Sequence, residues 1–234
     1  MKNNSFIHPS AVIGSGTVIE NNVHIEKNVK IGKNCKIQNG AYIGYNATTK
    51  ENQTILGNNC LIANNSTIYA SVVLNDNVKV RHNSIIRENV EIGESSNIGS
   101  LNTIEFDTKI GKFCSFHSRV HITDLSRIGD YVFIGPNFTS MSDPILAYRR
   151  PQISKKYTGI IISNAARIGG DVTVLPGMKI GYETMIGAGS FVKNNLPDWS
   201  LCIGDPARPV KKVAKEDGIS CLLYTSPSPR DKRQ

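Results

Sequence analysis

The sequence lacks the features that several functional classes require. No stretch approaches the roughly 18 consecutive apolar residues of a membrane-spanning helix, and the polar opening MKNNSFIHPS has no apolar secretory segment. The five cysteines form no CxxC pair or other metal-binding spacing, and aromatic residues make up 7% of the chain. We therefore expect a cytoplasmic protein without transmembrane segments and without a bound metal.

Net charge and chain length limit the class of ligand and the number of domains. The formal net charge is +8, but the basic residues are scattered and have few aromatic neighbours that could stack on bases. An anionic small molecule is therefore a better candidate ligand than a nucleic acid. With 234 residues and 39% hydrophobic content, the chain can bury one sizeable core, so a single domain is expected.

A six-residue repeat occupies most of the chain. An aliphatic residue recurs every six residues from Ile7 to Ile43, from Leu56 to Ile134 and from Ile162 to Val192, with Phe116 as the aromatic exception. No helical period occurs anywhere in this ladder. Such a fixed short period is typical of a solenoid, in which each repeat packs against its neighbours.

The residues between the aliphatic positions indicate how each repeat folds. Four residues after the aliphatic residue comes a small side chain in nearly every repeat, and strand alternation points both residues inward. Three residues after it comes Asn or Gly in many repeats, from Asn22 to Asn195, which predicts a sharp corner with positive φ. Three cysteines fall at the small position and are interpreted as reduced packing residues: Cys35, Cys60 and Cys114.

A short strand and a corner every six residues predict a β-solenoid, and three repeats per turn would give a triangular prism of about nine coils. The repeats, with Gly after the aliphatic residue as in Ile13-Gly14 and Ile168-Gly169, resemble the hexapeptide-repeat family of left-handed β-helix acyltransferases over roughly residues 7–213. This resemblance implies an all-β fold, a left-handed parallel β-helix with one long loop insertion and a short C-terminal helix.

The same resemblance suggests the domain boundaries. Residues 1–209 would form the β-helix domain with a lid loop at about 137–160, and residues 210–218 a short, truncated C-terminal helix. From Ser220 the text SCLLYTSPSPRDKRQ resembles translated sequencing adapter, so residues 220–234 are expected to be a non-native tail. A native disordered tail is the alternative.

The corner pattern fails around two histidines. His117 and His121 flank one corner, and strand alternation points both outward. Function in a repetitive solenoid is expected where repetition fails, so both are candidate catalytic residues, with solvated surface histidines as the alternative. The corner residues of this region include neither Asn nor Gly: they are Leu101, Asp107, Phe113, Arg119, Leu125 and Tyr131.

The longest insertion in the repeat, between Ile134 and Ile162, comes soon after these two histidines in the sequence. Loops of this length in compact domains are usually lids or binding segments. It carries Tyr148, Arg149 and Arg150, whose ring and cations suit a phosphate-bearing ligand, although a solvated charge run would look the same.

Two longer stretches narrow the resemblance to one branch. FHSRVHIT with DYVFIGPNFTSMSDP, and the segment from ARIGGDVTVLPG to GDPARPVKK, resemble enzymes that N-acetylate nucleotide-linked amino sugars for surface polysaccharide synthesis. The resemblance implies acetyl-CoA as co-substrate and a homotrimer. The coenzyme A contacts that it implies are Gly169, Gly187, Ala188, Gly204, Pro206, Ala207 and Lys211.

Acetyl transfer to an amine requires a proton acceptor. A histidine, whose unperturbed pKa is about 6.5, can accept that proton at neutral pH, and backbone amides of a rigid coil can stabilise the oxyanion. We expect His117 to be the base, with His121 and Asp124 orienting it or the sugar, and Asn137 and Asp143 holding the acceptor. In some members of the branch the histidines are substrate contacts and no protein base acts.

Other functions remain open at this point. O-acetylation is the nearest, although Ser142-Asp143-Pro144 stands where the galactoside and maltose O-acetyltransferases carry a histidine. A non-enzymatic solenoid such as an ice-binding prism would need a regular Thr ladder, and the outward positions here are mixed. A zinc enzyme of the γ-carbonic-anhydrase type needs three histidines, two of them five apart, whereas His117 and His121 are four apart.

Overall fold

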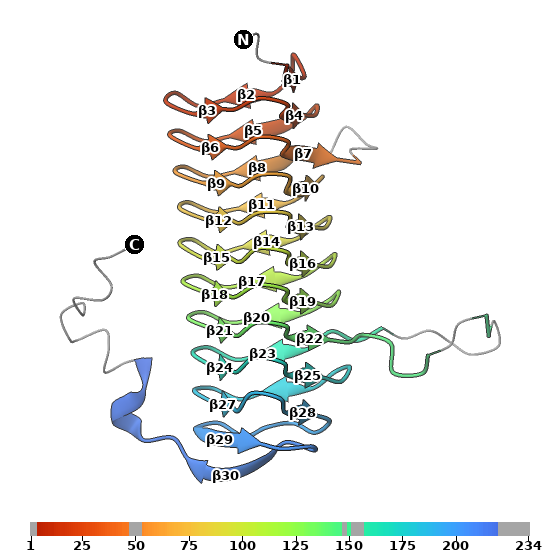
Figure 1. Cartoon of the computed structure of the whole chain (residues 1–234), viewed down its shortest axis with the longest axis vertical. Coiled ribbons are helices and arrows are strands. Elements are labelled where there is room, and N and C mark those ends of the chain that lie inside the picture. The colour runs from red at the N-terminus through yellow and green to blue at the C-terminus, as the bar shows by residue number, and fades with distance from the viewer. Residues whose placement is uncertain (1–3, 47–52, 147–148, 151–156, 220–234) are drawn as a thin grey trace.

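The computed structural model describes residues 4–46, 53–146, 149–150 and 157–219. Within these residues the chain winds as a coil of short parallel strands, three to a turn, along one long axis (Figure 1). The described strands form three sheets of 10, 9 and 11 members, so the prism has about ten coils instead of the predicted nine. The predicted all-β parallel β-helix is confirmed.

The three sheets form the sides of the prism and are called sheets A, B and C. Sheet A contains β1 (Phe6–Ile7), β4 (His24–Ile25), β7 (Tyr42–Tyr45), β10 (Thr67–Tyr69), β13 (Ile85–Ile86), β16 (Thr103–Ile104), β19 (His121–Ile122), β22 (Thr139–Ser140), β25 (Thr173–Val174) and β28 (Phe191–Val192). Sheet B contains β2 (Val12–Ile13), β5 (Val29–Ile31), β8 (Thr54–Leu56), β11 (Val73–Leu74), β14 (Glu91–Ile92), β17 (Lys109–Ile110), β20 (Arg127–Ile128), β23 (Ile161–Ile162) and β26 (Lys179–Ile180). Sheet C contains β3 (Val18–Ile19), β6 (Lys36–Ile37), β9 (Leu61–Ile62), β12 (Lys79–Val80), β15 (Asn97–Ile98), β18 (Ser115–Phe116), β21 (Phe133–Ile134), β24 (Arg167–Ile168), β27 (Met185–Ile186), β29 (Ser200–Ile203) and β30 (Arg208–Lys212).

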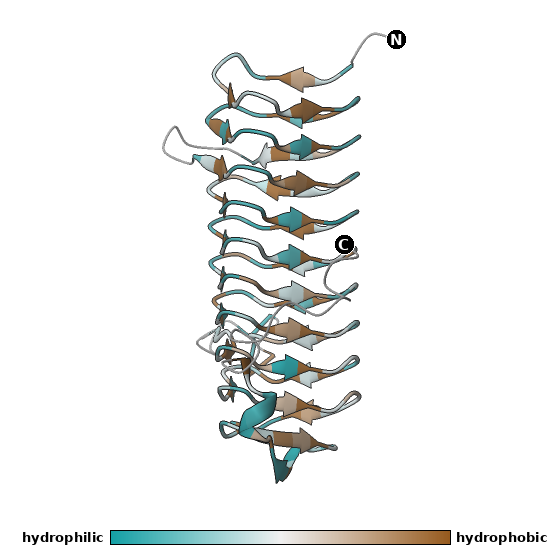
Figure 2. Ribbon diagram, turned by 90° about the vertical axis from the view of Figure 1, so that its left-hand side faces the viewer, coloured by the Kyte–Doolittle hydropathy of each residue, from teal (hydrophilic) through white to brown (hydrophobic). Residues whose placement is uncertain are grey.

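Like residues stack on one another because each strand pairs in parallel with the strand one coil later. Ile86 lies opposite Ile104, which lies opposite Ile122. Residues that share a position in successive coils are called a column. The aliphatic column is almost completely buried from Ile25 onward, whereas Ile7 in the first coil is 41% exposed because no coil covers it. Figure 2 shows hydrophobic and hydrophilic residues side by side within the strands, with hydrophilic residues in many of the turns.

The insertion begins later than the sequence predicts. β22 continues sheet A, so Phe138 and Ser140 fill the small and the aliphatic positions of one further repeat, 0% and 2% exposed. The inserted chain leaves after Ser140, and the N–H of Thr158 donates to the carbonyl of Ser142 at 2.9 Å where it returns. The pattern missed this repeat because it carries Ser at the aliphatic position and Phe at the small one.

The segment 210–218, predicted as a short helix, is part strand and part 3-10 helix. β29 turns back into β30, which pairs with it antiparallel, and a 3-10 helix (η1, Lys215–Asp217) follows. β30 covers the open edge of β29, whose N–H and C=O groups would otherwise lack partners at the end of the prism. The predicted tail, 220–234, lies outside the described residues. In the part of the chain that is described, no helix is long and apolar enough to span a membrane.

Small inward residues close the corners with hydrogen bonds. The hydroxyl of Ser84 donates to the carbonyl of Gly99 at 2.8 Å and accepts the N–H of Asn102 at 3.2 Å. The thiol of Cys114 donates to the carbonyl of Gly129 in the same way, at 3.1 Å. Burial raises the pKa of this thiol to about 11. The predicted packing role of the cysteines is confirmed for the described ones, which are free and buried; Cys221 lies outside them.

Asn102 departs from this arrangement at the coil that carries the two histidines. It is 1% exposed, and its Oδ1 accepts the N–H of Val120 at 2.9 Å, as a serine hydroxyl would. Its Nδ2 is buried without a hydrogen-bond partner. By the pattern of Ser84 and Gly99, a hydroxyl here would donate to the carbonyl of His117. A buried unpaired donor costs about 1–3 kcal/mol, so Asn102 lowers stability beneath the histidine corner.

The bulky corners predicted from the sequence are confirmed as left-handed. Leu101, Phe113 and Tyr131 have φ of 61°, 56° and 59°, and Arg119 and Leu125 both have 58°. Side chains other than Gly, Asn and Asp pay roughly 1–2 kcal/mol for this conformation. Strain therefore gathers at the corners of these coils. The prediction was wrong for Asn195, which is absent from the residues with positive φ because the chain leaves the regular repeat after β28.

Replacing Asn102 by Ser should stabilise the protein. The serine hydroxyl can accept the N–H of Val120 and donate to the carbonyl of His117, which removes the orphaned amide. We expect a gain of about 1 kcal/mol, or about 2–4 °C in Tm by calorimetry. Asn102→Ala is the matched control and should lower Tm, because it leaves the N–H of Val120 unpaired. Equal Tm values for the two variants would contradict this account.

Exchanging corner residues should move stability in opposite directions. Leu125 and Asn89 belong to one corner column and have φ of 58° and 59°. Leu125→Asn should gain about 1 kcal/mol and Asn89→Leu should lose about as much, because Asn tolerates the left-handed region better. Urea unfolding of both variants measures the difference, and a loss of stability in Leu125→Asn would show that the leucine makes compensating contacts.

Candidate active site

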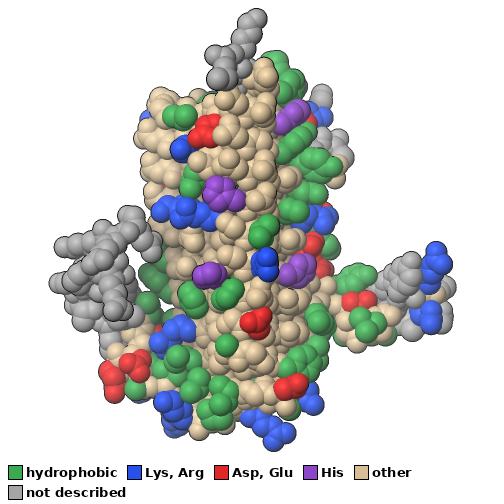
Figure 3. All heavy atoms as spheres, in the orientation of Figure 1, with side chains coloured by type: hydrophobic (Ala, Val, Ile, Leu, Met, Phe, Trp, Pro, Cys, Tyr) green, Lys and Arg blue, Asp and Glu red, His purple; other side chains and the backbone are tan. Residues whose placement is uncertain are grey.

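The two candidate histidines lie on either side of one corner, as predicted. His117 follows β18 at the end of sheet C, and His121 opens β19 at the start of sheet A, with Arg119 at the corner between them. We call this edge of the prism, where sheet C passes into sheet A, the C/A corner. His117 is exposed and His121 half-buried. Figure 3 shows histidine side chains exposed on the face toward the viewer.

His117 is held by a hydrogen bond to its own corner. The backbone N–H of Ser118 donates to its Nδ1 at 2.9 Å. Because Nδ1 accepts, the neutral ring carries its proton on Nε2. In this arrangement the outward nitrogen of His117 is a hydrogen-bond donor.

His121 is less constrained. It lies in sheet A between Thr103 and Thr139 of the adjacent coils, and among the described residues its ring makes no hydrogen bond. Either ring nitrogen is therefore able to accept a proton. No group of three His, Cys, Asp or Glu within the described part of the chain is arranged to hold a metal ion.

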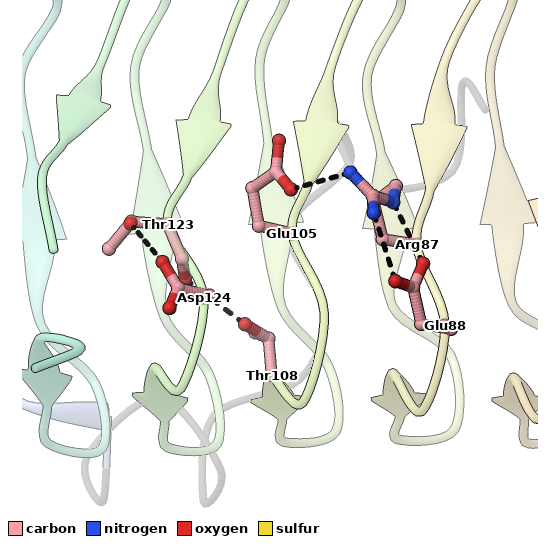
Figure 4. A network of polar contacts seen from close by, with 6 residues as sticks. All are labelled: Arg87, Glu88, Glu105, Thr108, Thr123 and Asp124. Carbon is pink, nitrogen blue, oxygen red and sulfur yellow. Dashed lines mark hydrogen bonds and ion pairs between the residues drawn. The ribbon is translucent and has the colours of Figure 1, made fainter. Parts of the chain in front are cut away.

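Asp124 does not lie beside the histidines. It follows the other end of β19, at the corner where sheet A passes into sheet B, called the A/B corner, about 10 Å along the extended chain from His121. It is 7% exposed, and its Oδ1 accepts the hydroxyl of Thr123 at 2.9 Å. Figure 4 shows Thr123 and Asp124 near Thr108 and the ion pairs that Arg87 forms with Glu88 and Glu105. No contact in the described structure supports an orienting role for Asp124 toward either histidine.

Asn137 lies on the same edge of the prism as the histidines, whereas Asp143 does not. Asn137 is the C/A corner residue one coil after Arg119, and its Nδ2 donates to Asp171 at 3.0 Å. Asp143 lies in the insertion, where its Oδ1 accepts the N–H groups of Ile145 and Leu146 at 3.0 and 2.9 Å. Asp143 therefore shapes its own turn.

The insertion leaves the prism at the A/B corner and extends away from it (Figure 1). Its cations Arg149 and Arg150 are exposed on it. Tyr148, the third predicted ligand contact there, lies outside the described residues. The insertion thus starts at the opposite edge of sheet A from His117 and His121.

The predicted coenzyme A residues Gly169 and Gly187 continue the C/A corner below His117. An added Cβ would lie 2.6 Å from the N of Ala188 at Gly169, and 2.4 Å from the side chain of Ile203 at Gly187. Packing between coils therefore explains why both residues are glycine. Gly169 and Gly187 are related to the histidines by position: they lie one coil apart on the same edge as His117.

The C/A corner offers free backbone donors on the C-terminal side of the histidines. The N–H groups of Gly170 and Ala188 make no hydrogen bond within the described part of the chain, and both residues reach the surface. At the corner between sheets B and C, several of the equivalent N–H groups are instead capped by a side chain of the next coil; for example, Lys112 donates to Asp130 at 2.9 Å and Tyr182 to Asp198 at 2.7 Å. Two successive uncapped donors suit the carbonyl groups of an extended ligand.

The remaining predicted cofactor residues close the same edge. Gly204 follows β29, and its N–H donates to the hydroxyl of Ser190 at 3.2 Å. Ala207 is 3% exposed and donates to the carbonyl of Phe191 at 2.8 Å, which fixes the turn that contains Pro206. Lys211, on β30, is exposed. The C/A corner thus runs without interruption from the histidines to the Gly204 turn.

Sequence reasoning missed the Ser118 N–H, which fixes His117, and the free N–H of Gly170. The second had a signal in the sequence: Ala188 stands one coil after Gly170, where residues such as Asp130 cap the preceding coil at the other corner, and alanine has no acceptor that could do so. The first depends on a side-chain rotamer, which no sequence pattern encodes.

Comparison with known proteins supports the repeat assignment. A model described as bacterial transferase hexapeptide (six repeats) matches residues 10–45 and 53–88. A protein of Staphylococcus aureus (strain Mu50 / ATCC 700699) named as an acetyltransferase is 38% identical over 121 residues, covering 47% of this chain and 61% of that protein. The galactoside O-acetyltransferase of Lactococcus lactis is 35% identical over 95 residues, 38% of this chain and 44% of that enzyme.

One further match concerns a named enzyme activity, and another concerns the fold. The chloramphenicol acetyltransferase of Klebsiella aerogenes is 30% identical over 117 residues, 49% of this chain and 55% of that enzyme. The chain therefore spans less than two thirds of the length of each of these three relatives. The UDP-N-acetylglucosamine acyltransferase of Campylobacter jejuni matches with a TM-score of 0.63 over 98% of this chain and 79% of that chain at 19% identity, which concerns the fold alone. The family model thus identifies hexapeptide repeats in residues 10–45 and 53–88, and the described fold continues the same repeat beyond them.

Proposed function

We propose that the protein is an acyltransferase that moves an acetyl group from acetyl-CoA to the amino group of a nucleotide-linked amino sugar. The observation that carries this proposal is the C/A corner, where two outward histidines and uncapped backbone donors lie along one edge. The named activities of the relatives that are 30–38% identical support acetyl transfer.

The donor would lie on the C-terminal part of this corner. Acetyl-CoA has an extended arm with amide carbonyls, which suit the N–H groups of Gly170 and Ala188, and the turn at Gly204 would receive its far end. The thioester would then lie near His117 and Asn137. This orientation rests on Gly187, Ala188 and Gly204, the contacts that the resemblance implies, which lie on the C-terminal half of the corner.

The chemistry assigns different roles to the two histidines. The amine nitrogen attacks the thioester carbonyl, an N–C bond forms, the C–S bond breaks, and the proton of the amine must reach the departing thiolate. His121, with both ring nitrogens free, is the proposed base that takes this proton and passes it on. His117, with its proton on Nε2, is the proposed donor to the acceptor sugar or to the oxyanion.

O-acetylation is the second candidate, and the match to a galactoside O-acetyltransferase favours it. An alcohol has no lone pair as nucleophilic as that of an amine, so it would depend more strongly on the base. Measuring CoA release with UDP- and dTDP-linked amino sugars against simple sugar alcohols decides between the two acceptors.

We further propose a homotrimer with active sites between subunits. The insertion starts at the A/B corner, across sheet A from the histidines, so it is badly placed to cover the histidines of its own chain. In a closed ring of three prisms, the insertion of one subunit would reach the C/A corner of its neighbour.

Replacing His121 should affect chemistry more than binding. We expect His121→Ala to lower kcat by about 10²- to 10⁴-fold with little change in the affinity for acetyl-CoA. His117→Ala should mainly raise KM for the acceptor. Steady-state kinetics and pH profiles measure both, and the base would be His117 if its variant alone lost the acidic limb of the kcat profile.

Mixed trimers should recover activity if the site is shared. One parent carries His121→Ala, and the other carries an insertion shortened between Ser142 and Thr158, where a backbone hydrogen bond already closes the loop. Differently tagged chains are co-expressed, and heterotrimers are purified through both tags. Heterotrimers should be clearly more active than either parent trimer; activity no higher than that of the parents would rule out sharing.

A further inference from the structure

A broad hollow lies on sheet C immediately N-terminal to His117. Its volume is about 1210 Å³, and it spans the outward faces of four successive coils. No carboxylate lines it, although the chain has 19 acidic residues. Its lining includes Lys79, Arg81, Ser95, Asn97, Phe113 and Ser115.

Two cations give this hollow a positive floor. Lys79 is exposed, and Arg81 is half-buried at the end of β12. The Nε of Arg81 donates to Oδ1 of Asn97 at 2.9 Å, which fixes the plane of the guanidinium. Its two terminal nitrogens have no partner among the described residues and can bind a diphosphate through several charge-assisted bonds.

Arg81 and His117 belong to one column. Each is the first residue after its strand in sheet C, and they stand two coils apart, which corresponds to about 10 Å at the usual strand spacing. Gly99 occupies the coil between them. Packing between coils explains this glycine, because an added Cβ would lie 2.3 Å from the carbonyl O of His117. The column therefore carries no side chain between the guanidinium and the imidazole.

An aromatic ring borders the other side of the hollow. Phe113 is 42% exposed at a corner with φ of 56°, and one face of its ring stacks on Tyr131 at 5.1 Å between centroids. Its neighbour in the preceding coil is Ser95, which is too small to cover the second face. The left-handed corner thus leaves one face of the Phe113 ring open on the side of Ser95.

We propose that this hollow binds the nucleoside diphosphate part of the acceptor: Lys79 and Arg81 bind the diphosphate, and Phe113 stacks on the base. The inference rests on the proposed function and deepens it. The sugar then lies over Gly99 with its amino group at His117 and His121. Acceptor and acetyl donor occupy opposite halves of the same edge and meet at the histidines.

Binding to the full chain tests the site without any turnover. UDP and dTDP are titrated by calorimetry, with uridine and thymidine as phosphate-free controls and inorganic pyrophosphate as the base-free probe. Arg81→Gln should weaken UDP, dTDP and pyrophosphate by about 10- to 100-fold. Phe113→Asn, which keeps a residue that tolerates positive φ, should weaken the nucleotides and leave pyrophosphate unchanged.

Lys109→Gln, on sheet B, is the matched control for the loss of one positive charge and should change none of these affinities. Acetyl-CoA affinity should stay the same in Arg81→Gln, because the donor lies on the other half of the corner. Unchanged nucleotide affinity in Arg81→Gln, or no binding of UDP and dTDP to the unaltered protein, overturns the inference.

Kinetics separate this inference from the proposed function. If the unaltered protein acetylates a nucleotide-linked amino sugar and Arg81→Gln leaves KM for it unchanged, the subsite is refuted while the function stands. If no amino sugar is acetylated but the nucleotides bind as described, the function fails and the diphosphate site stands.

Discussion

The in-register stacking of successive coils is the constraint on which the structure depends. Each strand pairs with the strand one coil later, so every side chain meets the residue at the same position of the coils above and below. Aliphatic residues gain burial from this arrangement, and small inward hydroxyls and thiols close the corners with hydrogen bonds. The core therefore requires few residue types, and the outer surface is left free to vary.

The same constraint explains why a function can occupy one edge of the prism. At the corner between sheets B and C, several backbone donors are capped by Asn and Asp side chains of the next coil. Below the histidines at the C/A corner, the N–H groups of Gly170 and Ala188 have no such cap in the described part of the chain. An omitted cap costs the fold a hydrogen bond and provides a donor for a ligand. The buried amide of Asn102 and the left-handed Arg119 add local strain at this edge.

Much of the fold could be predicted because the repeat is so regular. The period predicted the solenoid, and the corner register correctly placed even Leu101 and Phe113 in the left-handed region. The strand alternation correctly pointed His117 and His121 outward. Departures from the repeat were harder: Ser140 continues the ladder without an aliphatic side chain, and β30 forms because a strand edge remains open at the end of the prism. The hand followed from family resemblance, since a period carries no chirality.

The site was only partly predictable for the same reason. Column membership places His117, Asn137, Gly169 and Gly187 on one edge, and this could be counted from the sequence. Asp124 was grouped with the histidines by closeness in sequence, but in an extended strand three residues span about 10 Å and reach the next corner. The hydrogen bond from Ser118 to the ring of His117 depends on a rotamer, which lies beyond any repeat pattern.

A stack of regular coils also fixes the distances between groups along its axis. Groups on one edge are separated by whole numbers of strand spacings, each about 4.8 Å, so the gap between Arg81 and His117 is set by counting coils. Gaining or losing one coil of about 18 residues between them would change that gap by one step while every column kept its register. Acceptors of different length could thus be accommodated within this architecture by duplication or deletion of whole coils, without rebuilding the core.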